Sequence, residues 1–332
     1  LPGLTLYNDG DAERFEKVID STIKRHRDAM LCESDTPDSG LWFIRAIQQY
    51  VDYGADASSV WKKYGKWLVD IIESFLGNAR TSVHLHENGL LWAQKYGVAL
   101  TWMNTYVDGS PVSERPGYQV EVNALWYNAL CFVRDLDLKF GKGKLVQRTD
   151  SIIGKIRENY TKVFWCEERN HLADYVDEHG QNIFTRPNQL IACCVKYSPL
   201  DDVTKMAVLT AVKKELLTVR GIRSLSPKNP LYRGVYEGDQ GSRDIAHFNG
   251  CAFPWLLTPY IEANLALTGK GFVKKAKEML EAFEEDMEIH GIGSVAEIYD
   301  GDPSHRPHGC ISSAISVAEI VRGKSILNRI KK

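Results

Sequence analysis

The stretch VEVNALWYNALCFV, from Val120 to Val133, has apolar side chains around nearly its whole circumference when it is wound into a helix. A helix of this kind offers no continuous polar face to water and must be buried on most sides. The segment SGLWFIRAIQQYV, from Ser39 to Val51, shows the same pattern. Both segments therefore predict inner helices that other parts of the chain surround.

Amphipathic segments alternate with these apolar ones along the chain. Within 11–30, the side chains of Phe15, Ile19 and Ile23 recur at helical spacing among charged residues, which is typical of an outer helix with one solvated face. Further amphipathic segments cover 60–75, 146–163, 201–218 and 272–289, and further apolar ones cover 187–196, 250–267 and 310–322. The alternation predicts an all-α fold with about five pairs of outer and inner helices.

The connections between these helices differ in length. Those from an inner helix to the next outer helix are short, as at 197–200, whereas those from outer to inner are long, as at 77–117 and 219–248. Because consecutive helices alternate in direction, all the long connections emerge on the face that holds the N-terminal ends of the inner helices. We expect the functional site on that face, with short hairpins inside the long loops. Since no Pro- or Ser-rich linker interrupts the pattern, residues 1–332 are expected to form one domain.

The composition is that of a globular protein and excludes several classes of partner. Of 332 residues, 44% are hydrophobic and 25% are charged, and the formal net charge is -2. A chain of this charge has no general attraction for nucleic acid or for anionic membranes. No apolar run approaches the roughly 18 residues that a membrane span needs. The seven cysteines lack paired metal-ligand spacing, so a reducing, cytoplasmic compartment is the simplest expectation.

Five loops collect aromatic and polar side chains. They contain TPDSGLW from Thr36, NGLLWAQKYGVALTWMN from Asn88, FTRPNQL from Phe184, YRGVYEGDQGSRDIAHFNG from Tyr232 and GSVAEIYDGDPSHRPHGC from Gly293. A sugar ring presents hydroxyl groups to amides and carboxylates and an apolar face to aromatic rings, so this mixture favours a saccharide ligand. Any single loop carries little weight, because turns are polar in most proteins.

The last of these loops holds the best candidate for a catalytic carboxylate. Hydrolysis of a glycosidic bond needs one carboxylic acid that protonates the leaving oxygen and one carboxylate that acts from the opposite side. Glu297 lies between apolar neighbours, and Asp300, His305 and Arg306 follow it closely, an arrangement that can tune its pKa. The alternative interpretation is a surface glutamate paired with Arg306.

Two clusters raise the question of a metal site. One contains His84, His86 and Glu87, and the other contains Asp300, Asp302, His305 and His308. Closed metal sites usually show tighter ligand spacing than either cluster. We therefore expect no metal, and hydrogen bonding to a substrate or to loop backbone is the favoured role of these side chains.

Four motifs spread along the chain are specific in combination: VEVNALWYNAL, RPNQL, GDQGSRDIAHFNGCAFPWLLTPY, and GSVAEIYDGDPSHRPHGC with ISVAEIVR after it. Together they resemble the amylo-α-1,6-glucosidase domain of glycogen debranching enzymes, over nearly the whole chain. The resemblance implies an (α/α)6 toroid of alternating inner and outer helices without an organic cofactor. It also implies a glycosidase that removes α-1,6-linked glucose branches from glycogen or a related α-glucan, with inversion at the anomeric carbon.

Two positions carry the mechanism that the resemblance implies. The glutamate of the family's S-x-x-E-x-x-D-G stretch, its general base, falls on Glu297. The family usually reads T-W-M-D, in which the aspartate is the general acid, whereas Trp102 and Met103 are followed here by Asn104. An amide cannot donate a proton as a carboxylic acid does. We therefore expect Asp108, four residues further on, to supply the acid, with Glu121 as the second choice.

Other residues of the implied sugar pocket match the family motif by motif. The expected substrate-binding residues are Asp38, Trp42, Trp102, Asn104, Glu121, Arg186, Asn188, Gln189, Asp239, Gln240, His247, Asp300, His305 and Arg306. Trp255 follows Pro254 in a largely apolar segment, and it is either a core residue or part of the pocket wall.

The resemblance also leads to expectations about what lies outside the chain and about alternative functions. The family toroid has one helix pair more than the periodicity shows, so we expect the first hairpin to be absent here; a preceding domain in a longer protein is left open. The leading hypothesis is the α-1,6-glucosidase. The alternatives are a non-catalytic or weakly active glycan-binding relative that lacks the acid, and a toroidal hydrolase for another sugar linkage.

Overall fold

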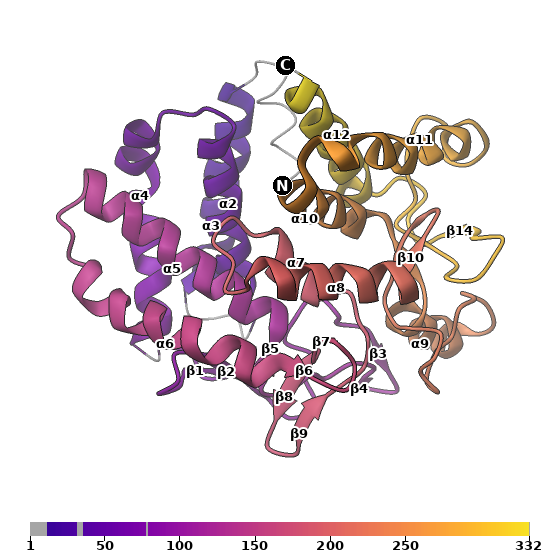
Figure 1. The fold of residues 1–332 in the computed structure, drawn as a ribbon, viewed down its shortest axis with the longest axis horizontal. Helices are drawn as coiled ribbons and strands as arrows, with labels where there is room; N and C mark the ends of the chain where they lie inside the picture. Colours follow the sequence, from indigo (N-terminus) through magenta and orange to yellow (C-terminus); the bar gives the residue numbers. More distant parts are fainter. Residues whose placement is uncertain (1–11, 32–35, 78, 332) are drawn as a thin grey trace.

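A computed structural model of the chain describes residues 12–31, 36–77 and 79–331. Within these ranges, outer and inner helices alternate along the chain in five pairs (Figure 1). The pairs are α2 (Ala12–Leu31) with α3 (Ser39–Asp52), α4 (Ala57–Leu76) with α5 (Val120–Phe140), α6 (Val146–Phe164) with α7 (Gln189–Cys194), α8 (Asp202–Glu215) with α10 (Leu257–Thr268), and α11 (Val273–Ile289) with α12 (Ala314–Lys331). The mainly helical fold predicted from the sequence is confirmed. None of the described helices combines the length and the apolar content needed to cross a membrane.

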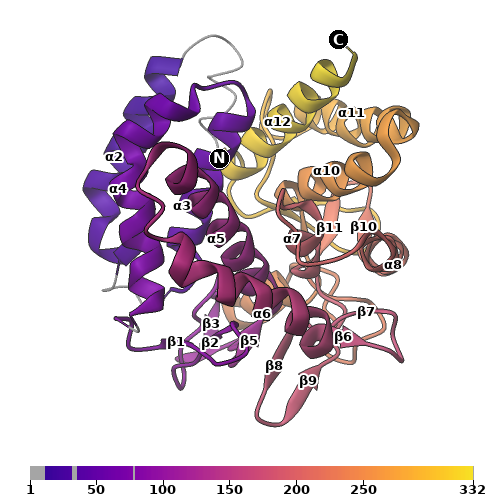
Figure 2. The ribbon, with the colours of Figure 1, turned by 60° about the vertical axis from the view of Figure 1, so that its left-hand side comes forward.

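Each inner helix packs against the inner helix of the next pair. The contacts run from α3 to α5, from α5 to α7, from α7 to α10 and from α10 to α12, with the outer helices against their flanks (Figure 2). Between α3 and α5, Gln48 and Asn128 exchange two side-chain hydrogen bonds of 3.1 and 2.9 Å in a buried environment. Because buried amides must be paired, this exchange sets the register of two otherwise apolar surfaces.

Helix α5 is buried along most of its length. Every residue from Val120 to Val133 is buried, as the apolar pattern of this stretch predicts. The ring of Trp126 lies 5.3 Å from that of Phe75 on α4, and its indole N–H donates to the carbonyl of Gly89 at 3.2 Å. The hydrogen bond allows a large side chain to be buried without an unpaired polar group. The helix therefore serves as the shared core of the first three pairs.

Small antiparallel sheets occupy the connections that lead from outer to inner helices, where short hairpins were expected. They are β1 (Val83–Leu85) with β2 (Leu91–Ala93); β3 (Tyr106–Val107) with β4 (Ser110–Pro111); β5 (Tyr118–Gln119) with β8 (Tyr175–Asp177) and β9 (Gly180–Asn182); β6 (Trp165–Cys166) with β7 (His171–Leu172); and, in order, β10 (Leu217–Thr218), β11 (Gly221–Arg223), β12 (Ala252–Phe253), β13 (Ile298–Tyr299) and β14 (Pro307–His308). In Figure 1, β1 to β9 lie at the lower end of the molecule, where α5 begins, whereas β10 and β14 lie on the right-hand side, near α9 and α10.

The five-stranded sheet joins two connections that are far apart in the sequence. Ile222 of β11 pairs with Phe253 of β12, and Ala252 of β12 pairs with Tyr299 of β13. Strand β14 then pairs with β13 on its other side. The connection before α10 and the connection before α12 are thus held edge to edge, which brings their loops to one place.

The structure corrects the boundaries of some predicted helices and adds one helix. The apolar pattern predicts an inner helix from 250, but α10 begins only at Leu257, after β12 and the short 3₁₀ helix η1 (Pro254–Leu256). Pro254 has no N–H to donate and disfavours a helical conformation of the residue before it. Similarly, α7 is shorter than 187–196, and α12 begins at Ala314 rather than at 310.

The added helix, α9 (Gln240–Asn249), occupies the last part of the predicted connection 219–248 and extends one residue beyond it. Asp239 caps it by accepting a hydrogen bond from the backbone N–H of Ser242 at 2.8 Å. An aspartate before the first helical residue is a start signal that is independent of apolar periodicity. A second 3₁₀ helix, η2 (Gly269–Phe272), connects α10 to α11.

A buried ion-pair network holds α10 against α12. The side chain of Arg322 on α12 is 1% exposed. Its guanidinium donates to both oxygens of Glu262 at 2.7 and 2.9 Å and to Glu319 at 2.7 to 3.1 Å. Burial opposes ionisation of Glu262, but Arg322 lowers its pKa overall. Arg322 is the closest cation of both carboxylates, and charges that are removed from water need paired partners.

Replacement of Arg322 by alanine leaves the buried carboxylate of Glu319 and the partly buried carboxylate of Glu262 without their closest cation. We expect Arg322→Ala to lower the free energy of unfolding by about 3–5 kcal/mol, measured by urea unfolding at neutral pH. The matched control is Lys324→Ala on the same helix, because the pair of Lys324 with Glu284 is solvent-exposed and should contribute less than about 1 kcal/mol. Equal effects of the two substitutions would contradict the role of the network.

Candidate functional site

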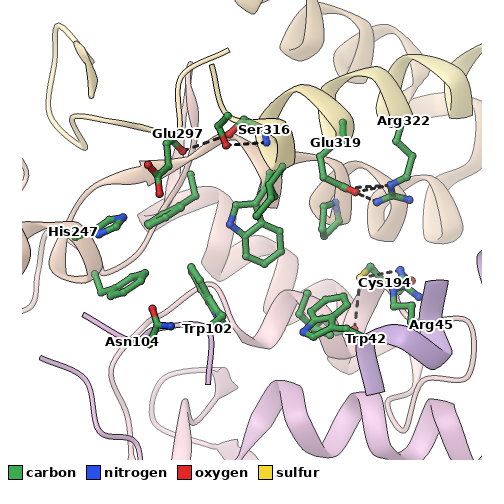
Figure 3. A pocket seen from close by; sticks show the side chains of 18 residues that line it. Trp42, Arg45, Trp102, Asn104, Cys194, His247, Glu297, Ser316, Glu319 and Arg322 are labelled. Atoms are coloured by element: carbon green, nitrogen blue, oxygen red, sulfur yellow. Dashed lines mark hydrogen bonds and ion pairs between the residues drawn. The ribbon is translucent and has the colours of Figure 1, made fainter. Parts of the chain in front are cut away.

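A cavity of about 480 Å³ opens among the inner helices and the connections that precede them (Figure 3). Its lining residues come from α3, α7, α9, α10, α12 and the intervening loops. They are Trp42, Arg45, Trp102, Asn104, Ile191, Cys194, His247, Phe248, Phe253, Trp255, Pro259, Glu297, Ser313, Ile315, Ser316, Ala318, Glu319 and Arg322. A volume of this size lies within the range of about 300–1,000 Å³ that is usual for small-molecule sites.

One end of the cavity is polar and contains Asn104, His247 and Glu297 (Figure 3). The three residues come from the connection before α5, from α9 and from the connection before α12. The five-stranded sheet brings the last two of these segments together. All three are predicted site residues, and the structure brings them to one place.

The turn after β14 positions Glu297. The backbone N–H of Cys310 donates to Oε2 of Glu297 at 2.9 Å, and the backbone N–H of Glu297 donates to the carbonyl of Cys310 at 3.0 Å. Gly309 has φ +70°, and a Cβ added there would lie 2.7 Å from Oε2 of Glu297 and 3.0 Å from its Cβ. Only glycine combines this backbone conformation with such a close approach. The carboxylate is therefore oriented by backbone groups.

A buried arginine positions the connection that carries the tryptophan of the T-W-M-N stretch. Arg115 donates to both oxygens of Glu121 at 2.6 Å and to those of Asp174 at 2.7 and 3.1 Å. Asp174 also accepts from Nδ2 of Asn188 at 2.7 Å, and Oδ1 of Asn188 accepts the indole N–H of Trp102 at 2.8 Å. This chain of contacts uses the polar atom of Trp102 inside the protein, so the ring presents an apolar surface to the cavity.

Asp38 lies at the start of α3, four residues before Trp42. Its side chain is buried, and burial raises the pKa of its carboxyl group to about 7. The negative charge of Glu121 raises it further, whereas the positive charge of Arg115 lowers it. Asp38 does not line the cavity, but its charge state changes close to neutral pH.

His247 presents an unpaired ring nitrogen at the polar end. Its Nδ1 lies 3.4 Å from Oγ1 of Thr105, while its Nε2 is buried and has no hydrogen-bond partner among the described residues. Burial lowers the pKa of the imidazole, although Glu297 opposes this effect. The ring stacks on Phe248 at 4.6 Å and on Phe253 at 5.5 Å. A neutral imidazole that is fixed by stacking, with one free nitrogen, is suited to hydrogen-bond a ligand.

Aromatic rings form the wall next to the polar end. Trp102 packs edge to face against Phe248, Phe253 and Trp255, with ring centroids 5.1 to 5.3 Å apart. Trp255 in turn lies 6.4 Å from Trp42. The sequence left Trp255 open between core and pocket, and the structure places it in the wall. Such rings offer apolar faces of the kind on which sugars pack.

Some of the predicted site residues line the cavity, and others lie outside its lining. Trp42, Trp102, Asn104, His247 and Glu297 line it. The predicted residues outside its lining are Asp38, Asp108, Glu121, Arg186, Asn188, Gln189, Asp239, Gln240, Asp300, His305 and Arg306.

Several of the predicted residues outside the lining support the loops that build the site. Arg186 donates to the backbone carbonyl of Ser224 and to Oδ1 of Asn249, and Gln189 accepts from the backbone N–H of Leu172 at 3.2 Å. Asp300 is buried and accepts from the backbone N–H of Tyr236 at 2.8 Å. Their first role is therefore to hold backbone in position around the cavity.

Five of the predicted residues lie nearer the surface: Asp108, Asp239, Gln240, His305 and Arg306. Glu121, in contrast, is enclosed with Arg115. Asp108 occupies the turn between β3 and β4 with φ 48° and is exposed. Asp239 and Gln240 begin α9, and His305 hydrogen-bonds the carbonyl of Asp300 through Nδ1 at 2.9 Å. Arg306, weighed as a partner of Glu297, lies 3.8 Å from Asp300 instead.

The sequence does not predict the residues that line the end of the cavity opposite Glu297. This end contains Arg45, Cys194, Glu319 and Arg322 (Figure 3). The available signals were an arginine inside the apolar helix 39–51 and the i,i+3 spacing of Glu319 and Arg322. Neither indicates a cavity, because both patterns also occur in structural ion pairs.

The two histidine clusters make hydrogen bonds and ring contacts. Nδ1 of His86 lies 2.7 Å from the hydroxyl of Tyr118, and its ring stacks on Trp92. Nε2 of His308 lies 2.9 Å from Oδ1 of Asp300. Within the described ranges, no group of three or more His, Cys, Asp or Glu side chains is arranged to hold a metal ion.

An α-helical protein whose connections gather a carboxylate, an imidazole and tryptophan rings around one cavity has the features of a carbohydrate-binding or carbohydrate-cleaving protein. Comparison with family models agrees with this class, since the model of the amylo-alpha-1,6-glucosidase family matches residues 20–322. The match covers most of the chain, and the chain therefore belongs to this family.

Among solved structures, a GH78 family rhamnosidase of Bacillus sp. GL1 is similar to this chain, with a TM-score of 0.52 and 15% sequence identity. The similarity covers 86% of this chain and 26% of the rhamnosidase chain, so this chain spans about a quarter of that protein's length. At this level of identity the likeness concerns the fold alone. A search of curated proteins found no match.

The contact between Gly309 and Glu297 predicts a specific effect of a methyl group. Gly309→Ala should displace the Glu297 side chain, lower the melting temperature and weaken the binding of an oligosaccharide, because the new Cβ collides with Glu297. Gly293→Ala is the control: Gly293 has φ +75° but nothing lies within 4 Å of its added Cβ. It should show only the backbone cost of about 1–2 kcal/mol. Identical melting temperatures and affinities for the two variants would refute the positioning role of Gly309.

The raised pKa of Asp38 predicts a pH-dependent gain of stability on its removal. Folding raises this pKa from 3.8 to about 7, so the folded state binds the extra proton and loses stability as pH rises from about 4 to 7. Asp38→Asn should therefore be more stable than the wild type at pH 8, by up to about 4 kcal/mol, and equal to it near pH 4. Thermal unfolding across this range measures the difference. Asp56→Asn, at the exposed cap of α4, should show no such gain.

Proposed function

We propose that this chain is a glycoside hydrolase that removes α-1,6-linked glucose branches from glycogen or a related α-glucan, with inversion at the anomeric carbon. The observation that carries the proposal is the position of Glu297 at the polar end of a cavity walled by Trp42, Trp102 and Trp255. A glucose ring packed on these indoles would present its anomeric carbon to the polar end. Membership of the amylo-alpha-1,6-glucosidase family supports the same linkage.

Glu297 is the general base in this proposal. A base that activates water must be held still while the water attacks, and the Cys310 N–H and the close approach of Gly309 provide this restraint. In inverting glycosidases the two carboxyl groups lie about 6.5–9.5 Å apart, which leaves room for the water. His247 would hydrogen-bond a sugar hydroxyl through its free Nε2.

Asp108 is the proposed proton donor. It lies in the turn between β3 and β4, four residues after Asn104, and β3 packs against α9, the helix that carries His247. The carboxyl group is exposed, so a bound glycan can reach it from the solvent side. Glu121 is a poorer choice, because Arg115 binds both of its oxygens in an enclosed environment.

One observation favours a second candidate, a glycan-binding relative with little or no hydrolysis. Asn104 lines the same end of the cavity as Glu297, and no other carboxyl group of the described residues lines that end. Glu319, the remaining acidic residue of the lining, is bound by Arg322. A protein that kept the sugar pocket and lost the acid would look like this.

Glucose release from a branched limit dextrin tests the proposal. We expect Glu297→Gln and Asp108→Asn each to lower the rate at least about 100-fold, since proton transfer by a positioned group contributes about 10² to 10⁴. Glu237→Gln, an exposed carboxylate on a neighbouring loop, is the control and should retain full activity. The anomer released is read by NMR, and β-glucose is expected from inversion.

The outcomes separate the candidates. Full activity in Asp108→Asn together with a gain in Asn104→Asp would exclude Asp108 as the donor. Maltosaccharide binding without glucose release by the wild type would favour the glycan-binding candidate. A panel that includes α-1,4-glucosides and α-rhamnosides exposes a hydrolase for another linkage, the third alternative.

We further propose that the described helices belong to one (α/α)6 toroid domain and that the protein acts in the cytoplasm. The order of contacts from α3 through α5, α7 and α10 to α12 supports a ring of inner helices. Six cysteines of the described residues are free, which suits a reducing compartment.

A further inference from the structure

We propose that the end of the cavity opposite Glu297 is an oxyanion site, in which Arg45 binds a carboxylate or phosphate group of the ligand. The inference rests on the proposed α-glucan function and adds to that site a subsite for an acidic group on the saccharide. Arg45 lies on the inner helix α3, is 3% exposed and yet lines the cavity. Figure 3 shows it at the far end from Glu297, beside Cys194.

Arg45 is under-bonded for a buried guanidinium. Its Nη2 lies 3.4 Å from the carbonyl of Cys194, 3.7 Å from the sulfur of the same residue and 3.6 Å from Oε2 of Glu262. No residue in the described part of the chain accepts a hydrogen bond from its Nε or Nη1. Charge-assisted hydrogen bonds are usually about 2.7–2.9 Å long, so even the Nη2 contacts are weak.

The neighbouring carboxylates are already committed to the other arginine. Arg322 donates to both oxygens of Glu262 at 2.7 and 2.9 Å and to both oxygens of Glu319 at 2.7 to 3.1 Å. Arg45 is left with the single 3.6 Å approach to Glu262. A buried cation without a close partner is costly, and an anion in the cavity would supply the missing partner.

The lining of the cavity between Arg45 and Glu297 suits a saccharide that carries a carboxylate or phosphate group. Trp42 precedes Arg45 by three residues on α3, so both side chains project from the same side of the helix. Trp42 and Trp255 line the space between Arg45 and the polar end. A ligand of about disaccharide size can therefore pack its rings on the indoles, with one sugar near Glu297 and its acidic group at Arg45. The planar fork of a guanidinium binds carboxylate and phosphate equally well in geometric terms.

Calorimetric titration of the full chain with matched neutral and acidic disaccharides tests the inference. Maltitol and maltobionate differ by one carboxylate, and trehalose and trehalose 6-phosphate differ by one phosphate. We expect the acidic member of at least one pair to bind at least about tenfold more tightly. The pair that shows the preference identifies the anion.

Variants of Arg45 assign the preference to this residue. Arg45→Gln should abolish the preference for the acidic ligand and change the affinity for the neutral one by less than about twofold. Arg45→Lys keeps the charge but loses the fork, so a reduced preference is expected. Arg148→Gln removes an exposed arginine of α6 outside the cavity and should leave the preference unchanged.

The result that overturns the inference is equal affinity of the wild type for both members of both pairs, and this comparison holds even if Arg45→Gln does not fold. A preference that survives in Arg45→Gln overturns it as well. If none of the four saccharides binds, the proposed α-glucoside function fails together with it. Binding of the neutral saccharides without a preference leaves that function intact and rejects only the oxyanion site.

Discussion

The rest of the structure depends on one buried cation, Arg115. Its guanidinium binds Glu121 at the start of α5 and Asp174 in the connection before α7, and it also reaches Thr101. Its backbone φ of 54° is unusual for a residue with a side chain. Three separate segments therefore meet on one charge, and the loss of any partner would leave a buried charge unpaired. Because the same network continues to Trp102, the constraint that closes the fold also builds the wall of the cavity.

Two further buried arginines illustrate a structural role and a ligand-binding role of the same side chain. Arg322 is paired with Glu262 and Glu319 at short distances, and it joins α10 to α12. Arg45 shares that environment but has only long contacts. Both are buried arginines on inner helices, so they differ only in how closely acceptor groups surround the guanidinium. A fully paired guanidinium stabilises the fold, whereas one with free donors facing a cavity can take a ligand.

Much of the helical architecture could be predicted because it follows from local periodicity. The apolar stretch 120–133 is buried throughout, and the alternation of outer and inner segments holds along the described chain. What periodicity missed depends on single residues: Pro254 delays the start of α10, and Asp239 caps α9, a helix with few apolar residues. The polar end of the cavity was predictable in part, since Glu297 and His247 stand in distinctive motifs.

By itself, the sequence determined the alternation of five outer and five inner helices, which of them are buried, the resemblance to the family and the carboxylate of the last long loop. Local patterns suffice for these features because burial and helical spacing act within a few turns. Only the tertiary structure decided which polar residues face the cavity. Asn188, Asp300 and Arg186 have motif positions like those of Trp102 and His247. Asn188, however, binds the side chain of Asp174, and Asp300 and Arg186 bind backbone groups. Whether a polar atom is free for a ligand depends on partners far away in the sequence, and those exist only once the chain has folded.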